Sequence, residues 1–217
     1  MIVVIQCAAR KKSNAGHLCR RDGQPILFVA DPSTAPTGAG IAYARPDDNS
    51  DTGISWRDDL LEYNADPGKN SLHLLPAWQL YENRTYERLL GRYGLENFYI
   101  LSAGWGLIAA DFLTPAYDIT FSPSVDRHKR RKKKDRYDDF RMLPANTAEP
   151  VVFFGGKDYV PLFCSLTENV KGRRVLFYNS ANAPDAPGCR LTRFNTTTRT
   201  NWHYRCANAF INGEITL

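Results

Sequence analysis

The sequence predicts a single α/β domain with a mainly parallel central sheet, helices on both faces and long loop insertions. Three observations lead to this fold class. Short β-branched and aromatic runs alternate along the chain with segments of helical periodicity, which is typical of a parallel sheet covered by helices. Glycine, serine, asparagine or cysteine follows directly after at least four of these runs. The length of 217 residues fits one domain, which we place over residues 1–217.

The N-terminal quarter of the chain predicts two strands and a long loop. Residues 2–6 form a β-branched run that is typical of a buried strand, and residues 26–30 form a second short strand. Residues 31–55 then contain repeated Pro and Gly turns among Asp, Asn and Ser, without periodicity. This pattern predicts a structureless surface excursion, and loops of this length in compact domains are often functional.

Helices and one strand are predicted for the middle of the chain. Residues 56–63 favour one or two helical turns. A longer helix begins near Pro76, a residue suited to a first turn, and ends at Gly94. Residues 98–102 then predict a strand that runs directly into the small residues of segment 103–106. Large apolar residues recur at helical spacing within the longer helix: Trp78, Tyr81, Tyr86, Leu89, Leu90 and Tyr93.

The second half of the chain predicts a similar alternation. Residues 107–125 contain mixed turns, and residues 122–145 form a basic insertion that is expected to extend as a helix through Arg141. Ligands bind outside the carboxyl ends of the strands in open α/β sheets, so we expect a pocket for a small molecule or nucleotide there. The remaining elements are strand 151–154 ending in Gly155-Gly156, helix 159–166, strand 174–178 ending at Asn179, loop 180–189, and a last helix from Trp202 to Gly213.

The basic charge of the protein is concentrated in one segment. The net charge is +5, but residues 127–136 hold eight Lys and Arg against one Asp, which leaves −2 for the rest of the chain. Such a strip attracts polyanions and releases counterions on binding nucleic acid. A solvated mobile loop is the alternative interpretation. The candidate nucleic-acid contacts are Arg127, Lys129, Arg130, Arg131, Lys132, Lys133, Lys134 and Arg136.

The segment Ser102-Ala-Gly-Trp-Gly106 is the most informative local cluster. Small residues after a strand let backbone amides approach a phosphate or a sugar closely. The alternative is a tight turn packed by Trp105. The segment matches neither the phosphate loop of nucleoside triphosphatases nor the dinucleotide-binding fingerprint, so a nucleoside triphosphate site is not expected.

Asp111 and Asp118 are the candidate catalytic carboxylates, because both follow this cluster within 16 residues. A carboxylate beside a glycine-rich pocket can act as a general base or stabilise an oxocarbenium ion. The alternative is that each carboxylate only caps or solvates a turn. Cys7 is expected to line the pocket without acting as a nucleophile, because no His is adjacent in the sequence. Lys12 and Asn179 are further candidate contacts to the substrate.

Composition and spacing exclude several classes of protein. The content of 43% hydrophobic and 24% charged residues excludes a disordered chain, a collagen and a coiled coil. No apolar run approaches the roughly 18 residues of a membrane span, and the first residues do not form a signal peptide. The five cysteines are widely spaced, and no pair of His residues has metal-ligand spacing. We therefore expect reduced thiols, a cytoplasmic location, no membrane contact, no metal and no organic cofactor.

Two blocks of the sequence carry a family resemblance. Residues 4–12 are Val-Ile-Gln-Cys-Ala-Ala-Arg-Lys-Lys, and residues 99–107 are Tyr-Ile-Leu-Ser-Ala-Gly-Trp-Gly-Leu. Together with the aspartates after the second block, they resemble a bacterial and phage family related to the YaaA-like proteins. In that family a smaller aromatic stands at position 105 and a Lys at position 104. Gly104 and Trp105 are the positions at which this sequence departs from the family pattern. The resemblance implies that the following residues line a pocket: Cys7, Lys12, Ser102, Gly106, Asp111, Tyr117 and Asp118.

Domains of this kind are related to tRNA-guanine transglycosylases and to DNA-modification and phage-defence proteins, so the resemblance implies chemistry at the N-glycosidic bond. We predict a glycosylase that excises a modified base from nucleic acid, with DNA favoured and glucosylated hydroxymethylcytosine of phage DNA as one candidate. The target nucleotide would be extruded into the pocket, and Trp105 or Tyr117 would stack on the base. The alternatives are a non-catalytic DNA-binding protein of stress or defence, and a nucleoside deoxyribosyltransferase or nucleotide hydrolase acting on free nucleotides.

Overall fold

The computed structural model describes residues 1–38 and 40–217 and shows an α/β fold around a seven-stranded sheet. The strand order is β12-β11-β10-β1-β5-β6-β9, and every neighbouring pair is parallel except β5 and β6. The predicted fold class is therefore confirmed. The strands of this sheet are β1 (Ile2–Gln6), β5 (Phe98–Ser102), β6 (Gly106–Ala109), β9 (Phe140–Arg141), β10 (Val151–Phe154), β11 (Arg174–Tyr178) and β12 (Cys189–Arg193).

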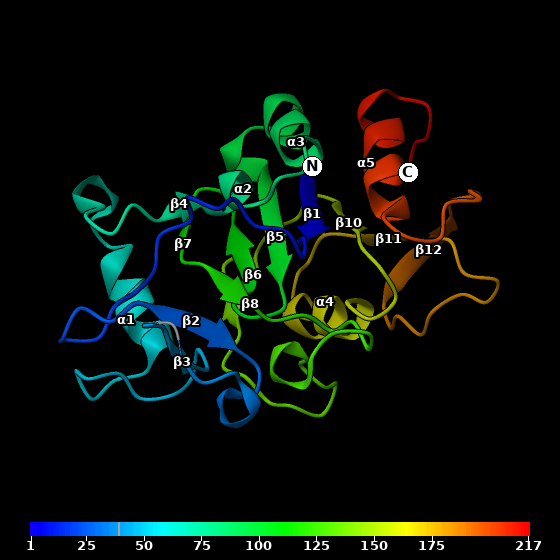
Figure 1. Cartoon of the computed structure of the whole chain (residues 1–217). Helices are drawn as coiled ribbons and strands as arrows, with labels where there is room; N and C mark the ends of the chain where they lie inside the picture. The colour runs from blue at the N-terminus through cyan, green and yellow to red at the C-terminus, as the bar shows by residue number, and fades with distance from the viewer. Residues whose placement is uncertain (39) are drawn as a thin grey trace.

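Helices cover both faces of the sheet (Figure 1). The helices are α1 (Trp56–Tyr63), α2 (Ala77–Leu80), α3 (Thr85–Tyr93), α4 (Val160–Leu166) and α5 (Trp202–Ile211). Phe153 and Phe154 follow each other in β10 and therefore point to opposite faces. Phe153 stacks on Phe163 of α4, whereas Phe154 packs against Phe210 of α5. Tyr93 of α3 stacks on the same Phe210, so α3 and α5 share a face and α4 lies on the other.

A smaller parallel sheet lies beside the main one and corrects the prediction for residues 31–55. Its strand order is β3 (Ala42–Ala44), β2 (Ile26–Val29), β8 (Tyr117–Asp118), and a further two-stranded sheet pairs β4 (Leu75–Pro76) with β7 (Leu113–Thr114). The expected structureless excursion instead contains a 3-10 helix at Pro32–Thr34 and the strand β3. Two alanines of β3 are buried against the core, a packing that the small side chains and surrounding turn residues did not reveal.

The helix predicted from Pro76 to Gly94 is two helices. It breaks after Leu80 because Tyr81 adopts an extended backbone, with φ −102° and ψ 141°, and bridges Lys11. The hydroxyl of Tyr81 lies 2.8 Å from that of Tyr117 in the core. A tertiary contact therefore interrupts a pattern whose spacing is helical throughout.

The helix expected to follow the basic strip up to Arg141 is also absent from the described residues. A 3-10 turn at Arg127–Lys129 leads into non-helical chain and then into β9. The chain is held in this form because the backbone of Arg130 pairs with that of Thr120. The predicted loop 180–189 is also corrected, because its last residue, Cys189, is the first residue of the edge strand β12.

The main sheet changes winding direction at β1. The crossover from β1 to β5 carries α3 on one face, whereas the crossover from β10 to β11 carries α4 on the other. The crevice between the carboxyl ends of β1 and β10 is therefore the topological switch point, the usual ligand site of open α/β sheets. None of the helices in the described ranges is long and apolar enough to cross a membrane.

Candidate functional site

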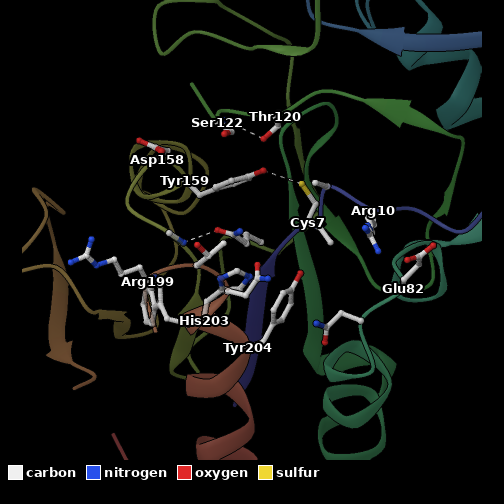
Figure 2. A pocket seen from close by; sticks show the side chains of 18 residues that line it. Cys7, Arg10, Glu82, Thr120, Ser122, Asp158, Tyr159, Arg199, His203 and Tyr204 are labelled. Carbon is white, nitrogen blue, oxygen red and sulfur yellow. Dashed lines mark hydrogen bonds between the residues drawn. The ribbon is translucent and has the colours of Figure 1, made fainter. Parts of the chain in front are cut away.

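A pocket of about 680 Å³ lies at this switch point (Figure 2). Gln6 and Cys7 at the end of β1 form its base, Tyr159 stands before α4, and the first turn of α5 forms another wall. The side chain of Gln6 accepts a hydrogen bond of 2.6 Å from the amide of Gly156, which joins the ends of β1 and β10. The volume falls within the roughly 300–1,000 Å³ of pockets that enclose small ligands.

Cys7 is the sequence-predicted site residue that lines this pocket. The side chain is 3% exposed, and its sulfur lies 3.2 Å from the hydroxyl of Tyr159. Burial raises the pKa of Tyr159 well above its ordinary value, so this hydroxyl is a neutral phenol at pH 7. The structure therefore places the thiol beside a neutral hydrogen-bonding group, and we assign Cys7 to the pocket lining.

A cluster of tyrosine hydroxyls lies behind Cys7. The hydroxyl of Tyr117 receives a hydrogen bond of 2.9 Å from Ser102 and lies 2.8 Å from the hydroxyl of Tyr81. Tyr86 stacks on Tyr81 and approaches the hydroxyl of Tyr204 within 3.2 Å. Tyr204 lines the pocket, whereas Tyr117 is buried and does not. The geometry gives Tyr117 a part in core packing and no surface on which a base could stack.

The segment 102–106 is a buried turn. Ser102 accepts hydrogen bonds from the amides of Gly104 and Trp105, at 3.2 and 3.1 Å, so these amides are already paired. A Cβ at Gly104 would make a tight contact of 3.2 Å with the ring of Tyr117. Gly106 has φ +88° and touches β9. Trp105 is fully buried against Phe28, so the tight-turn interpretation is the one that the geometry supports.

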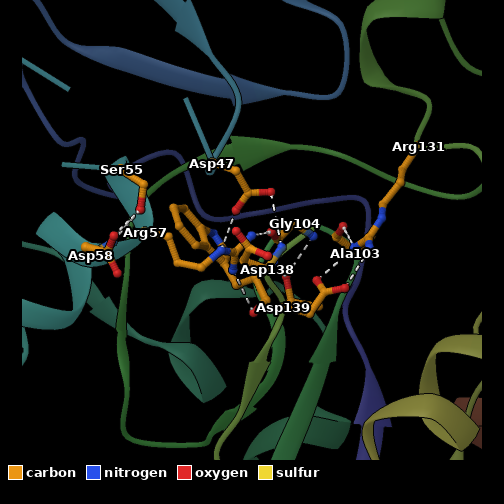
Figure 3. A network of polar contacts seen from close by, with 11 residues as sticks. Asp47, Ser55, Arg57, Asp58, Ala103, Gly104, Arg131, Asp138 and Asp139 are labelled. Atoms are coloured by element: carbon orange, nitrogen blue, oxygen red, sulfur yellow. Dashed lines mark hydrogen bonds and ion pairs between the residues drawn. The ribbon is translucent and has the colours of Figure 1, made fainter. Parts of the chain in front are cut away.

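Two arginines that the sequence did not single out as structural hold this turn in place (Figure 3). Arg57 of α1 is buried and donates to the carbonyls of Gly104 and Trp105, at 3.0 and 3.1 Å. Its Nε is 2.6 Å from the carboxylate of Asp47. Arg131, from the basic strip, donates to the carbonyl of Ala103 at 2.9 Å. Three successive carbonyls of the turn are thereby satisfied by buried cations.

The predicted catalytic aspartates lie outside the pocket. Asp111 is exposed, and Asp118 forms an ion pair of 3.0 Å with Lys129. The same contact raises the pKa of Lys129 above its ordinary value. In the described part of the chain, the carboxylates that line the pocket belong to Glu82 and Asp158, which lie on different sides of it (Figure 2). Neither residue sits in a recognisable sequence motif.

Four other residues near the strand ends have different surroundings. Lys12 is exposed and does not line the pocket, whereas Arg10 does. The ammonium of Lys11 lies 4.0 Å from the ring centre of Tyr117, and burial lowers the pKa of this lysine. Asn179 donates to a backbone carbonyl at 3.2 Å and lines a neighbouring cavity of about 470 Å³, which shares Asp158 and Arg199 with the pocket.

The basic strip divides into exposed and internally paired cations. Arg131 is 4% exposed, and Lys129 is half-buried in its pair with Asp118. The backbone of the strip pairs with Thr120, whose amide donates to the Lys129 carbonyl at 2.9 Å and which also lines the pocket. The strip therefore adjoins the pocket. Its exposed cations are Arg127, Arg130, Lys132, Lys133, Lys134 and Arg136.

Comparison of the chain with known protein families, curated proteins and solved structures found no match. The family resemblance and the activity that it implies therefore stay predictions. The described residues also contain no group of three or more His, Cys, Asp or Glu placed to hold a metal ion.

Proposed function

We propose that the pocket at the switch point holds one nucleotide of a nucleic acid and that the protein hydrolyses its N-glycosidic bond. The observation that carries this proposal is that a pocket of nucleotide size shares a hydrogen-bonded segment with a row of exposed cations. Thr120 lines the pocket and pairs with Arg130 of that row. Cations beside a pocket favour a polyanionic ligand whose reacting unit enters the pocket.

The proposed chemistry uses the pocket carboxylates. As the bond breaks, the base leaves with the electron pair and positive charge develops at C1′ of the sugar. A carboxylate stabilises this charge or accepts a proton from the attacking water, whose oxygen bonds to C1′ while the base gains a proton. Glu82 and Asp158 take the place of the two aspartates expected from the sequence. The rings of Tyr204 and Tyr159, at the pocket wall, are candidates for contact with the base.

The proposed substrate is DNA that carries a modified base, encountered in the cytoplasm. Extrusion of the nucleotide is required because the N-glycosidic bond is not accessible to a recessed pocket within a duplex. The exposed cations would contact flanking phosphates, which contributes affinity without sequence preference. Arg131 is not part of this contact surface, because its guanidinium is already paired inside the protein.

The test is a base-release assay by mass spectrometry. The protein is incubated with unmodified DNA, with DNA containing hydroxymethylated or glucosylated cytosine, and with free nucleotides. We expect release of a base from one of the DNA substrates, and a loss of at least about 100-fold in Glu82→Gln or Asp158→Asn, in line with the usual contribution of acid–base groups. Asp111→Asn, an exposed change outside the pocket, is the matched control.

Three outcomes would contradict the proposal. Binding of DNA without release from any substrate would indicate a non-catalytic DNA-binding protein. Turnover of free nucleotides alone would indicate a nucleotide hydrolase or transferase. Full activity in both pocket variants would show that these carboxylates do not carry the reaction.

A further inference from the structure

The first turn of α5 presents unpaired backbone donors at the pocket. The helix begins at Trp202 after Asn201, which has a left-handed backbone with φ +60° and makes no capping bond through its side chain. Within residues 1–38 and 40–217, the amides of Trp202 and His203 have no hydrogen-bond acceptor. An uncapped helix N-terminus carries partial positive charge and favours an anion. The pocket lies directly against this turn.

His203 adds a second, independent feature to this wall. It projects from the first turn of α5 and lines the pocket, although the residue is only 4% exposed (Figure 2). Its Nε2 is buried and has no hydrogen-bond partner among the described residues. Burial lowers the pKa of His203 to about 4, so the ring is neutral at pH 7 and retains one N–H. A buried polar atom without a partner is costly, and a ligand in the pocket would relieve that cost.

Arg199 supplies a full positive charge close to the same turn. It lines the pocket three residues before the helix, and its guanidinium forms no ion pair within the described part of the chain. Asp158, an acidic lining residue, lies on the same side of the pocket as Arg199 in Figure 2. Arginine suits phosphate because its planar group can donate two parallel hydrogen bonds.

We propose that the first turn of α5, with His203 and Arg199, binds the phosphate group of the nucleotide in the pocket. The nature of this ligand rests on the proposed function, whereas the anion site rests on the geometry of the turn. The phosphate would accept hydrogen bonds from the amides of Trp202 and His203, from the Nε2–H tautomer of His203 and from the Arg199 guanidinium. Its place at α5 would leave Glu82, on the other side of the pocket, free to face the sugar.

The test compares a nucleoside 5′-monophosphate, the same nucleoside and inorganic phosphate by titration calorimetry. We expect the monophosphate to bind at least about tenfold more tightly than the nucleoside, and inorganic phosphate to compete with it. Arg199→Ala and Asn201→Asp should each remove this preference. The new carboxylate in the second variant repels the anion, while as an N-cap residue it stabilises α5, so the thermal unfolding temperature should not fall. Arg193→Ala, an exposed arginine on β12 outside the pocket, is the control.

Two outcomes would overturn the phosphate site: equal binding of monophosphate and nucleoside by the unaltered protein, or an unchanged preference in both variants. These outcomes are separate from failure of the proposed function. If base release from DNA is observed but the preference for the monophosphate is absent, the phosphate site is wrong and the activity stands. If the preference for the monophosphate is present but no substrate loses a base, the phosphate site stands and the proposed activity is wrong.

Discussion

Arg131 and Asp139 form a buried two-point ion pair, with distances of 2.9 Å from Nη1 to Oδ1 and 2.6 Å from Nη2 to Oδ2 (Figure 3). The same guanidinium holds the carbonyl of Ala103. Arg131 thus belongs by sequence to the most basic segment of the protein and by structure to its interior. The side chain of Arg130, the preceding residue in the sequence, is instead exposed to solvent.

Arg131→Gln is expected to destabilise the fold by about 3–5 kcal/mol, the usual cost of removing one partner from a buried ion pair. The change leaves the carboxylate of Asp139 and one backbone carbonyl without their cation. Urea unfolding measures the difference. Arg130→Gln is the matched control and should stay within about 0.5 kcal/mol of the unaltered protein, as exposed substitutions usually do. An equal loss in both variants would contradict the structural role of Arg131.

Replacing Lys132, Lys133 and Lys134 with Gln should weaken DNA binding without altering stability, since all three side chains are exposed. The logarithm of the binding constant falls with the logarithm of salt concentration by roughly 0.9 for each phosphate contact, so the slope should become shallower by that amount per lost contact. Fluorescence anisotropy at several salt concentrations measures it. Lys171→Gln, a change at an exposed lysine outside residues 127–136, should leave the slope intact. An unchanged slope in the triple variant would remove the strip from the binding surface.

Much of the main sheet could be predicted because its central strands are continuous apolar runs. The strands at residues 2–6, 98–102, 151–154 and 174–178 have the predicted bounds, and nearly all of their residues are buried. The edge strand β12 was missed because it alternates polar and apolar residues beside a loop rich in Pro and Gly. The prediction of one helix from Pro76 to Gly94 was wrong because the core contact of Tyr81 with Tyr117 outweighs the helical spacing of the apolar residues.

The candidate site could be predicted in position but only in part by residue. Strand topology placed a pocket at the carboxyl ends, and Cys7 lies in it. The other predicted cluster, at 102–106, has the small residues of a ligand loop. Its amides at Gly104 and Trp105, however, already donate to the hydroxyl of Ser102. Glu82 and His203 come from segments more than 100 residues apart and carry no motif, so only the folded arrangement brings them to one pocket.

The stability of the protein should fall in mild acid partly because of His203. Its pKa of about 4 in the fold lies below the roughly 6.5 of an exposed histidine, so the unfolded chain takes up a proton first as the pH falls. This contribution to stability is fully present above about pH 6.5 and is lost progressively down to about pH 4, by at most about 1.4 kcal/mol per pH unit. Urea unfolding at pH 4.5–7.5 measures the slope, which His203→Gln should reduce. The same dependence of unfolding free energy on pH in His203→Gln and in the unaltered protein would contradict the burial of a neutral His203 ring.

Cys189 is expected to be alkylated faster than Cys19 at pH 7. Its sulfur lies 3.9 Å from that of Cys164, and this hydrogen bond, aided by the charge of Arg174, lowers the pKa of Cys189 below its ordinary value. Both Cys189 and Cys19 are half-buried, so the comparison is matched in exposure. Peptide mass spectrometry after brief iodoacetamide treatment at pH 6–9 follows each site. Cys164→Ala should move the reaction of Cys189 to higher pH, and an unchanged profile would contradict the pairing.

Under the proposed function, the pairing of Thr120 with Arg130 would give a polyanion two linked points of contact, the pocket and the exposed cations. The pocket and the exposed cations are joined through backbone hydrogen bonds, so a nucleic acid bound at one would be held close to the other. The second contact then forms at a high effective concentration, and affinity gains from avidity without any new bond. A mononucleotide can occupy only the pocket, whereas a strand long enough to reach the cations engages both. The proposed function therefore implies selection by the length of the nucleic-acid strand as well as by the identity of the base.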